Sequence, residues 1–193
     1  MDLVLDKQQM LEYYKESYYH EFVHKDSING RVSIPAGILP LLAGADIFLI
    51  NNIKDLDDSW FVWGTILVIL FTLALFFALY YIFRTLYNHK YGYTATPKEI
   101  YDYRKSLEGK YDESIIDAEM GDFLSTEFAN YASLNRKSNL SKVFYLRIVY
   151  YWIVAALIVG LLCIPVFIFG KSNGSDITRV QITNIPNAWY YNN

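Results

Sequence analysis

The stretch Trp60–Phe83, WFVWGTILVILFTLALFFALYYIF, decides the fold class of this chain. It carries no charged residue along its whole length and is followed directly by Arg84. An α-helix rises about 1.5 Å per residue, so roughly 20 apolar residues cross the hydrocarbon core of a bilayer, which is about 30 Å thick. A helix that is apolar on every side does not suit the surface of a soluble domain. The stretch therefore predicts a transmembrane helix.

Two further apolar segments accompany this one. The run Ile148–Gly170 is free of charge and predicts a second transmembrane helix. The segment 32–53 is long enough for a third, but it contains Pro35, Pro40 and Asp46. Because proline removes a backbone donor and bends a helix, the sequence leaves two alternatives for this segment, a kinked membrane span and a re-entrant hairpin.

Composition narrows the class of protein. The chain has 193 residues, of which 53% are hydrophobic and 18% aromatic, and its net charge is −3, which argues against nucleic-acid binding. The single cysteine, Cys163, excludes a disulfide or a cysteine-based metal site within one chain. The first thirty residues lack the apolar core of a secretory signal peptide. We therefore expect an all-α membrane protein with a small cytoplasmic helical part and no cofactor.

Lys and Arg near the apolar segments predict their orientation in the membrane. The loop 51–59 carries one Lys and three Asp, whereas the connection 84–147 is rich in Lys and Arg. This places 84–147 in the cytoplasm, and the loop 51–59 and the tail 171–193 outside. The N-terminal segment 1–31 is then cytoplasmic if 32–53 spans the membrane, and outside if it does not.

Two helices are predicted in the cytoplasmic connection. Residues 96–99, Thr-Pro-Lys-Glu, form a capping-box pattern with proline at the first helical position, and Gly109 is a natural stop for the helix 97–108. A longer helix begins near Asp112, and no Gly or Pro interrupts residues 122–159. The simplest interpretation is one rod that continues into the membrane. It is either a passive stalk or an element that transmits a cytoplasmic event into the bilayer.

The N-terminal segment 1–31 is predicted to be an amphipathic helix. Leu11, Tyr14, Tyr18 and Phe22 recur at helical spacing and form one apolar stripe. If the N-terminus is cytoplasmic, this helix and those of the connection form a small helical bundle.

The stretch HEFVH contains His20, Glu21 and His24 and matches the HExxH motif of zinc peptidases. In those enzymes both histidines bind zinc and the glutamate is the general base. A third ligand is missing at the usual spacings, because Ser27 and Gly30 occupy the places of Gly and His in the extended motif and no glutamate follows in range. We interpret the match as incidental and expect no catalytic or metal-binding residue. A zinc peptidase and a non-catalytic metal or pH-sensing site remain alternatives.

Asp46 is the only acidic residue within the three apolar segments. Ionisable side chains at such positions face a water path or a partner, although a position near the outer end would let this one reach the headgroups. Pro35 and Pro40 permit a bent backbone, which a membrane tolerates where it is buried or lines a cavity. These three residues are candidates for a pore or a helix contact, unless the whole segment is merely peripheral.

Asn135 and Asn139 are a second pair of contact candidates. By helical spacing they share one face of the long predicted helix with Tyr131, Lys142 and Leu146. A buried asparagine sets the register between packed helices. The alternative is a solvated face with a basic end close to the membrane.

Three stretches together show a resemblance to a known group. They are KDSINGRVSIPAGILPLLAG (25–44), YGYTATPKEIYDYRKSLEGKY (91–111) and NRKSNLSKVFYLRIVYYWIVAALIVGLL (135–162). Their order resembles small bacterial inner-membrane proteins similar in layout to the SLATT-type membrane effectors of nucleotide-signalled and antiphage defence loci. The resemblance implies a protein with two or three spans that oligomerises and disturbs the membrane when triggered. It brings no catalytic residue to this chain.

We therefore expect a non-enzymatic inner-membrane protein that forms homo-oligomers and perturbs the bilayer or forms a pore, with 97–142 as its control element. Its expected partners are the lipid bilayer and further copies of the chain. The alternative from another class is a membrane scaffold or anchor that holds a cytoplasmic partner protein.

Overall fold

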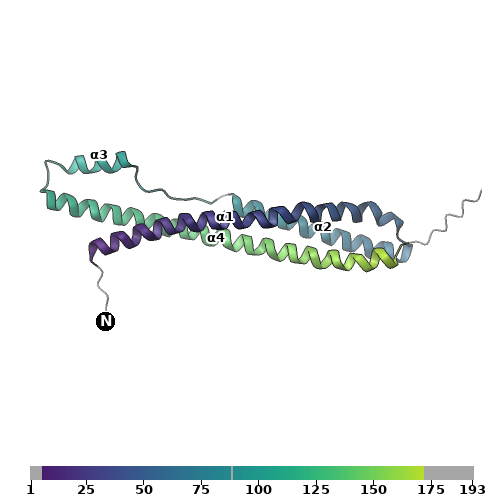
Figure 1. The fold of residues 1–193 in the computed structure, drawn as a ribbon. Coiled ribbons are helices and arrows are strands. Elements are labelled where there is room, and N and C mark those ends of the chain that lie inside the picture. Colours follow the sequence, from purple (N-terminus) through teal and green to yellow (C-terminus); the bar gives the residue numbers. More distant parts are fainter. Residues whose placement is uncertain (1–5, 88, 172–193) are drawn as a thin grey trace, which may run out of the picture.

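A computed structural model of the chain describes residues 6–87 and 89–171. Its elements are α1 (Lys7–Asn52), the 3₁₀ turn η1 (Ile53–Asp55), α2 (Asp58–Leu86), α3 (Pro97–Leu107) and α4 (Glu113–Phe169) (Figure 1). The predicted all-α class is confirmed, because these residues form helices joined by short connections and no strand. Of the predicted tail 171–193, all but the first residue lies outside the described residues.

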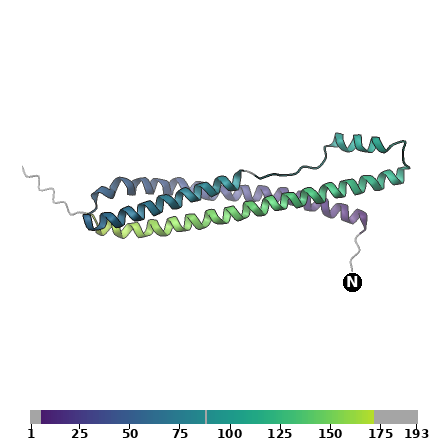
Figure 2. The ribbon, with the colours of Figure 1, turned by 180° about the vertical axis from the view of Figure 1, so that it is seen from behind.

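Helices α1, α2 and α4 form one elongated bundle. Helix α2 returns along α1, and α4 packs against both (Figures 1 and 2). Beyond the end of α2, α1 and α4 continue side by side, and α3 lies next to the first turns of α4. The ion pair between Lys7 and Asp122, with 3.2 Å between Nζ and Oδ2, joins the two N-terminal halves. The N-terminal helix therefore lies at the same end of the bundle as residues 97–147.

Helix α1 is one continuous helix of 46 residues that passes through Pro35 and Pro40. Residues 7–31 and 32–52, which the sequence separates by composition, are two halves of this one element. The re-entrant hairpin is not what the structure contains. Each proline removes only one backbone donor, and long apolar helices tolerate this where neighbouring helices pack against them.

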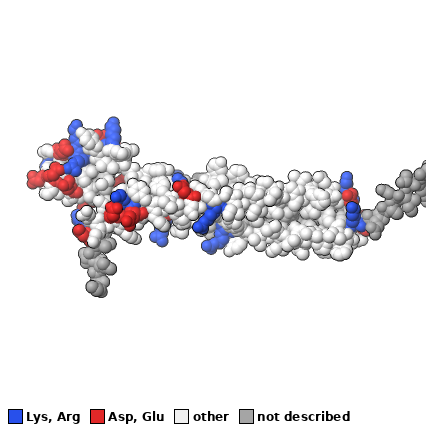
Figure 3. Space-filling model, in the orientation of Figure 1, with Lys and Arg blue, Asp and Glu red and all other residues white. Residues whose placement is uncertain are grey.

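All three bundle helices are long and apolar enough to cross a membrane. Large apolar side chains lie exposed on the outer face of each, including Leu41, Phe76 and Leu161. Figure 3 shows the result as a charge-free band, with charged residues gathered over the other half of the rod and at the far end. A soluble monomer rarely exposes so large an apolar surface, whereas lipid covers it without cost.

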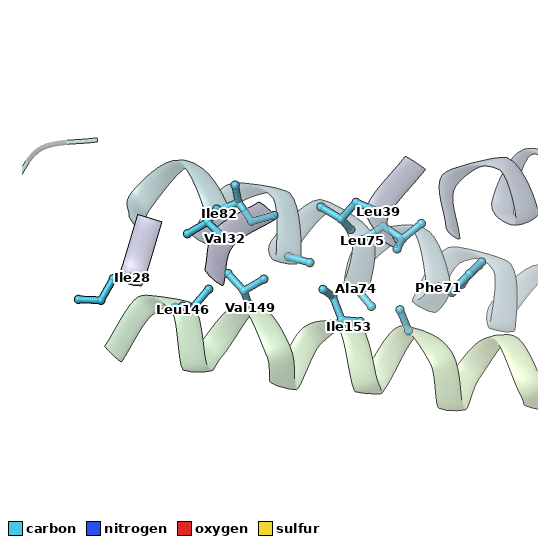
Figure 4. Close-up of a cluster of buried hydrophobic side chains, with 12 residues drawn as sticks. Ile28, Val32, Leu39, Phe71, Ala74, Leu75, Ile82, Leu146, Val149 and Ile153 are labelled. Carbon is cyan, nitrogen blue, oxygen red and sulfur yellow. The ribbon is translucent and has the colours of Figure 1, made fainter. Parts of the chain in front are cut away.

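A heptad-like seam fills the centre of the bundle (Figure 4). Ala74, Ala78 and Ala156 are at most 3% exposed, and such small side chains let helix backbones approach closely in an apolar medium. Larger side chains fill the remaining positions, namely Ile28, Val32 and Leu39 of α1, Phe71, Leu75 and Ile82 of α2, and Leu146, Val149 and Ile153 of α4.

At the end of the bundle opposite α3, helix α1 ends short of the start of α2, because Ile53 lies beside Gly64 of α2. The connection 53–57 then runs past the first turns of α2, where Leu56 packs onto Gly64 so closely that an added Cβ would lie 2.5 Å from Leu56 Cδ1. The backbone N–H of Asp57 donates to the carbonyl of Gly170 at 2.9 Å, which aligns the start of α2 with the end of α4. Residues near the C-terminal end of α1 consequently lie deeper in the apolar band than residues equally far from the N-terminal end of α2.

Candidate functional site

A cluster of polar side chains lies where the bundle leaves the apolar band. Residues 89–96, the linker between α2 and α3, run without regular structure along α4 and complete this cluster. Its members, called the polar junction below, are Glu21 and Asn29 of α1, Tyr91 and Gly92 of the linker, and Asn135, Ser138, Asn139 and Lys142 of α4.

Asn135 pairs with the backbone of the linker. The N–H of Gly92 donates to Asn135 Oδ1 at 2.8 Å, and Asn135 Nδ2 donates to the carbonyl of Gly92 at 3.2 Å. Asn135 is fully buried, so both bonds are shielded from water. Glycine is required at position 92, because a Cβ there would lie 2.0 Å from Tyr131 Cδ1. Ser138 adds a third bond, donating its hydroxyl hydrogen to the carbonyl of Lys90.

Asn139 joins all three segments of the polar junction. Its Nδ2 donates to the backbone carbonyl and to the carboxylate of Glu21, at 2.7 Å and 2.8 Å. Its Oδ1 accepts from the Tyr91 hydroxyl at 2.7 Å. One buried amide side chain therefore connects α1, the linker and α4. These contacts are of the kind by which a buried asparagine sets the register between packed helices.

Lys142 is a buried cation in this cluster, only 4% exposed. Its Nζ donates to Asn29 Oδ1 at 3.0 Å and lies 5.2 Å from the centre of the Tyr91 ring. Lys25 Nζ lies 4.6 Å from the centre of the same ring. Burial lowers the pKa of Lys142, and the charge of Lys25 lowers it further, while Asp26 opposes the change. Tyr91 stabilises both ammonium groups by cation–π attraction.

Burial also shifts the pKa of two linker residues, Tyr91 and His89. It raises the pKa of Tyr91 to about 12, with smaller contributions from the charges of Glu21 and Asp26, so this hydroxyl remains a hydrogen-bond donor at neutral pH. Burial lowers the pKa of His89, and the cations Lys142 and Arg84 lower it further. The hydrogen bond of His89 Nε2 to the carbonyl of Arg84 acts in the opposite direction.

The two histidines of HEFVH lie beside a groove between α1 and α4 with a volume of about 710 Å³. Their ring centres are 6.2 Å apart, and Arg136 and Ser133 line the opposite wall. Glu21, placed between them in sequence, turns its carboxylate to Asn139. Among the residues that the structure describes, no group of three His, Cys, Asp or Glu side chains is placed to hold a metal ion. The residues present thus do not fit a three-ligand zinc site.

Asp46 lies inside the bundle and is 6% exposed. Its carboxyl oxygens are 2.9 Å and 3.1 Å from Thr72 Oγ1 of α2. The side chain therefore points to a neighbouring helix and not to the end of the apolar band. Of the two prolines, Pro35 is buried in the seam and Pro40 lies on the outer face of α1.

Sequence spacing places Asn135, Asn139 and Lys142 on one face, and the structure buries all three. Spacing did not reveal the role of Glu21 or of the linker, because their partners are distant in sequence. Gly92 is the signal that the sequence offers for the linker, since glycine is the default residue where a backbone approaches another group closely.

Comparisons with protein-family models, with curated proteins and with solved structures found no match for this chain.

Proposed function

We propose that this chain is an inner-membrane protein with three spans that associates with further copies of itself and perturbs the bilayer when triggered. The excess of Lys and Arg in 84–147 puts this part in the cytoplasm. Since the N-terminal half of α1 lies at the same end of the bundle, it is cytoplasmic too. The loop 51–59 is then outside, and α1, α2 and α4 each cross once.

The observation that carries self-association is the outer face of α1. Gly30, Gly37 and Gly44 recur every seven residues on this face, all exposed, and a Cβ added at any of them would meet no atom of the chain within 4 Å. Helices in lipid associate through faces of small residues, which allow close backbone packing. The face thus suits the α1 helix of a second copy.

The polar junction supports the triggered part of the proposal. The N-terminal parts of α1 and α4, on one side of the junction, are cytoplasmic. On the other side, the same two helices continue through the apolar band without interruption. A cytoplasmic event that displaces the linker would break the bonds of Gly92 to Asn135 and of Tyr91 to Asn139. Asn139 is also the residue of α4 that bonds to Glu21 of α1. Such a displacement acts on both membrane helices at once. A defence or stress role is the context implied by the resemblance to SLATT-type effectors.

The test replaces glycines on the outer face. Gly37→Leu and Gly44→Leu are compared with Ala43→Leu, because Ala43 is also exposed on α1 but lies off the stripe. Oligomer size is measured in lipid nanodiscs, and membrane potential is measured in cells that overproduce each variant. We expect the glycine variants to lose both the oligomer and the depolarisation, with Ala43→Leu unchanged. Oligomers and depolarisation that survive both glycine substitutions would contradict the proposal.

The groove between α1 and α4 favours a second candidate, a scaffold that anchors a cytoplasmic protein. The groove is open and lined by Tyr13, Tyr14, Glu16 and Arg136. Aromatic side chains and arginine are enriched where proteins bind one another. If the chain is a scaffold, Tyr13→Ser should weaken the binding of the partner protein. Overproduction of a scaffold should leave the membrane potential unchanged, which separates it from the first proposal.

A further inference from the structure

The structure assigns to Asp46 a site for a proton within the apolar band: its carboxyl is held as the neutral acid, donating to Thr72 Oγ1, and this proton keeps α1 closed against α2. The inference concerns the single chain. It stands whether or not copies associate or the bilayer is perturbed.

Depth is the first observation. Thr72 lies 12 residues after Trp60 (72 − 60) and 11 before Phe83 (83 − 72), so it is at the middle of the charge-free run of α2. At about 1.5 Å per residue, roughly 17 Å of apolar helix lies on either side. Asp46 is in hydrogen-bond contact with this residue and therefore shares its depth.

Hydrogen-bond stoichiometry is the second observation. Thr72 Oγ1 lies 2.9 Å from the carbonyl oxygen of Val68 and 2.9 Å from Asp46 Oδ2. A hydroxyl has one hydrogen and cannot donate to both. If Asp46 carries a proton, it donates to Thr72 Oγ1 and the threonine hydrogen goes to the carbonyl of Val68, so that each of the two 2.9 Å contacts has a hydrogen. An ionised Asp46 would leave one of the two short contacts without a hydrogen.

Charge is the third observation. Apart from Asp46, no Asp, Glu, Lys or Arg occurs in 32–53, 60–83 or 148–170. Thr72 is the polar partner of Asp46 on α2, and Cys163 is a fully buried thiol of α4. An unpaired carboxylate in apolar surroundings is strongly disfavoured and takes up a proton instead. A protonated carboxyl needs no cation, and its single O–H hydrogen has an acceptor in the hydroxyl oxygen of Thr72.

Position in the seam links the proton to helix packing. Ile28, Val32, Leu39 and Asp46 follow one another at heptad spacing on the face of α1 that packs into the bundle. Loss of the proton would leave a carboxylate at a core position. Water entry or separation of α1 from α2 relieves that state, so the proton is a condition for a closed seam.

Infrared spectroscopy of the full chain in nanodiscs tests the protonation state. We expect the carbonyl stretch of a protonated carboxylic acid at neutral pH, and its loss in Asp46→Asn, which keeps the size and the donor of the neutral acid. Asp57→Asn is the matched control, because Asp57 is exposed at the end of the band and should not change this signal. Absence of the stretch in the unsubstituted chain would overturn the assignment.

The native Cys163, fully buried and the only cysteine of the chain, reports on the seam. Its rate of alkylation by a maleimide is measured against pH in the unsubstituted chain and in Asp46→Asn, so that the intrinsic rise in thiol reactivity cancels in the ratio of the two rates. We expect a ratio near one at neutral pH that rises several-fold in alkali. A ratio that stays at one throughout would show that the proton does not control packing.

Discussion

Asn135 of α4 and Gly92 of the linker are joined by two hydrogen bonds that run in opposite directions between the amide side chain and the glycine backbone. The pairing satisfies both the N–H and the carbonyl of Gly92, as a neighbouring strand would for a residue in a sheet. It makes the linker between α2 and α3 part of the packed bundle.

Replacing Asn135 with Ala should destabilise the bundle by about 2 kcal/mol, because two buried backbone groups of Gly92 would lose their partners. Urea unfolding in detergent measures the change. Asn130→Ala, at an exposed position of the same helix, is the control and should alter stability by less than about 0.5 kcal/mol. Equal losses of stability in both variants would show that the hydrogen bonds between Asn135 and Gly92 do not stabilise the bundle.

Gly92→Ala should displace the linker, since the new methyl group would overlap the Tyr131 ring. We expect faster proteolysis within residues 89–96 and a lower melting temperature. Gly121→Ala is the matched control, because Gly121 lies in a helix with open space around it, and alanine there should be neutral or stabilising. Tyr131→Ala combined with Gly92→Ala should restore part of the loss. A double variant as protease-sensitive as Gly92→Ala would place the clash elsewhere.

Lowering the pH should destabilise the packing of the linker, because His89 becomes protonated. Its pKa is lowered in the fold by burial and by Lys142 and Arg84, so the unfolded chain binds a proton more readily than the folded one. The contribution of neutral His89 is therefore complete above the ordinary pKa of about 6.5 and is lost as the pH falls through the lower value of the fold. Melting temperature against pH measures this. His89→Gln should remove the decline in that window, and an unchanged slope would count against it.

The start of α3 depends on Thr96. Its Oγ1 accepts from the N–H of Glu99 at 3.3 Å, and its own N–H donates to the Glu99 carboxylate at 2.6 Å. Thr96→Ala should destabilise this helix by about 1 kcal/mol, seen as faster hydrogen exchange over 97–107 with little change in α4. Thr96→Ser keeps the cap and should exchange like the unsubstituted chain. Loss of protection throughout the bundle would show that α3 is not a separate local unit.

The same cap has a pH dependence of defined sign. The hydrogen bonds from Thr96 lower the pKa of Glu99, so the cap is stabilising above the ordinary value of about 4.5 and weakens as the pH falls through the lower value of the fold. Hydrogen exchange of α3 should accelerate in that acidic range. Glu99→Gln should show no such acceleration.

Local patterns were sufficient for the helices themselves. The Thr-Pro-Lys-Glu pattern predicted the start of α3 at Pro97, and the absence of Gly and Pro after Asp122 predicted the unbroken rod of α4. These features depend on residues a few positions apart, so the sequence displays them directly. Segment 32–53 was ambiguous because prolines at 35 and 40 are compatible with a hairpin and with a helix, and only packing against α2 and α4 distinguishes the two.

The sequence by itself determined that the chain is helical and has three apolar segments long enough to cross a bilayer, because length and hydropathy are properties of each segment alone. Only the tertiary structure decided which polar groups meet. The offset between α1 and α2 brings Asp46 to Thr72, and the path of the linker brings Gly92 to Asn135, 43 residues away. Such pairings depend on how whole helices are aligned against one another, and no local spacing in the sequence encodes that alignment.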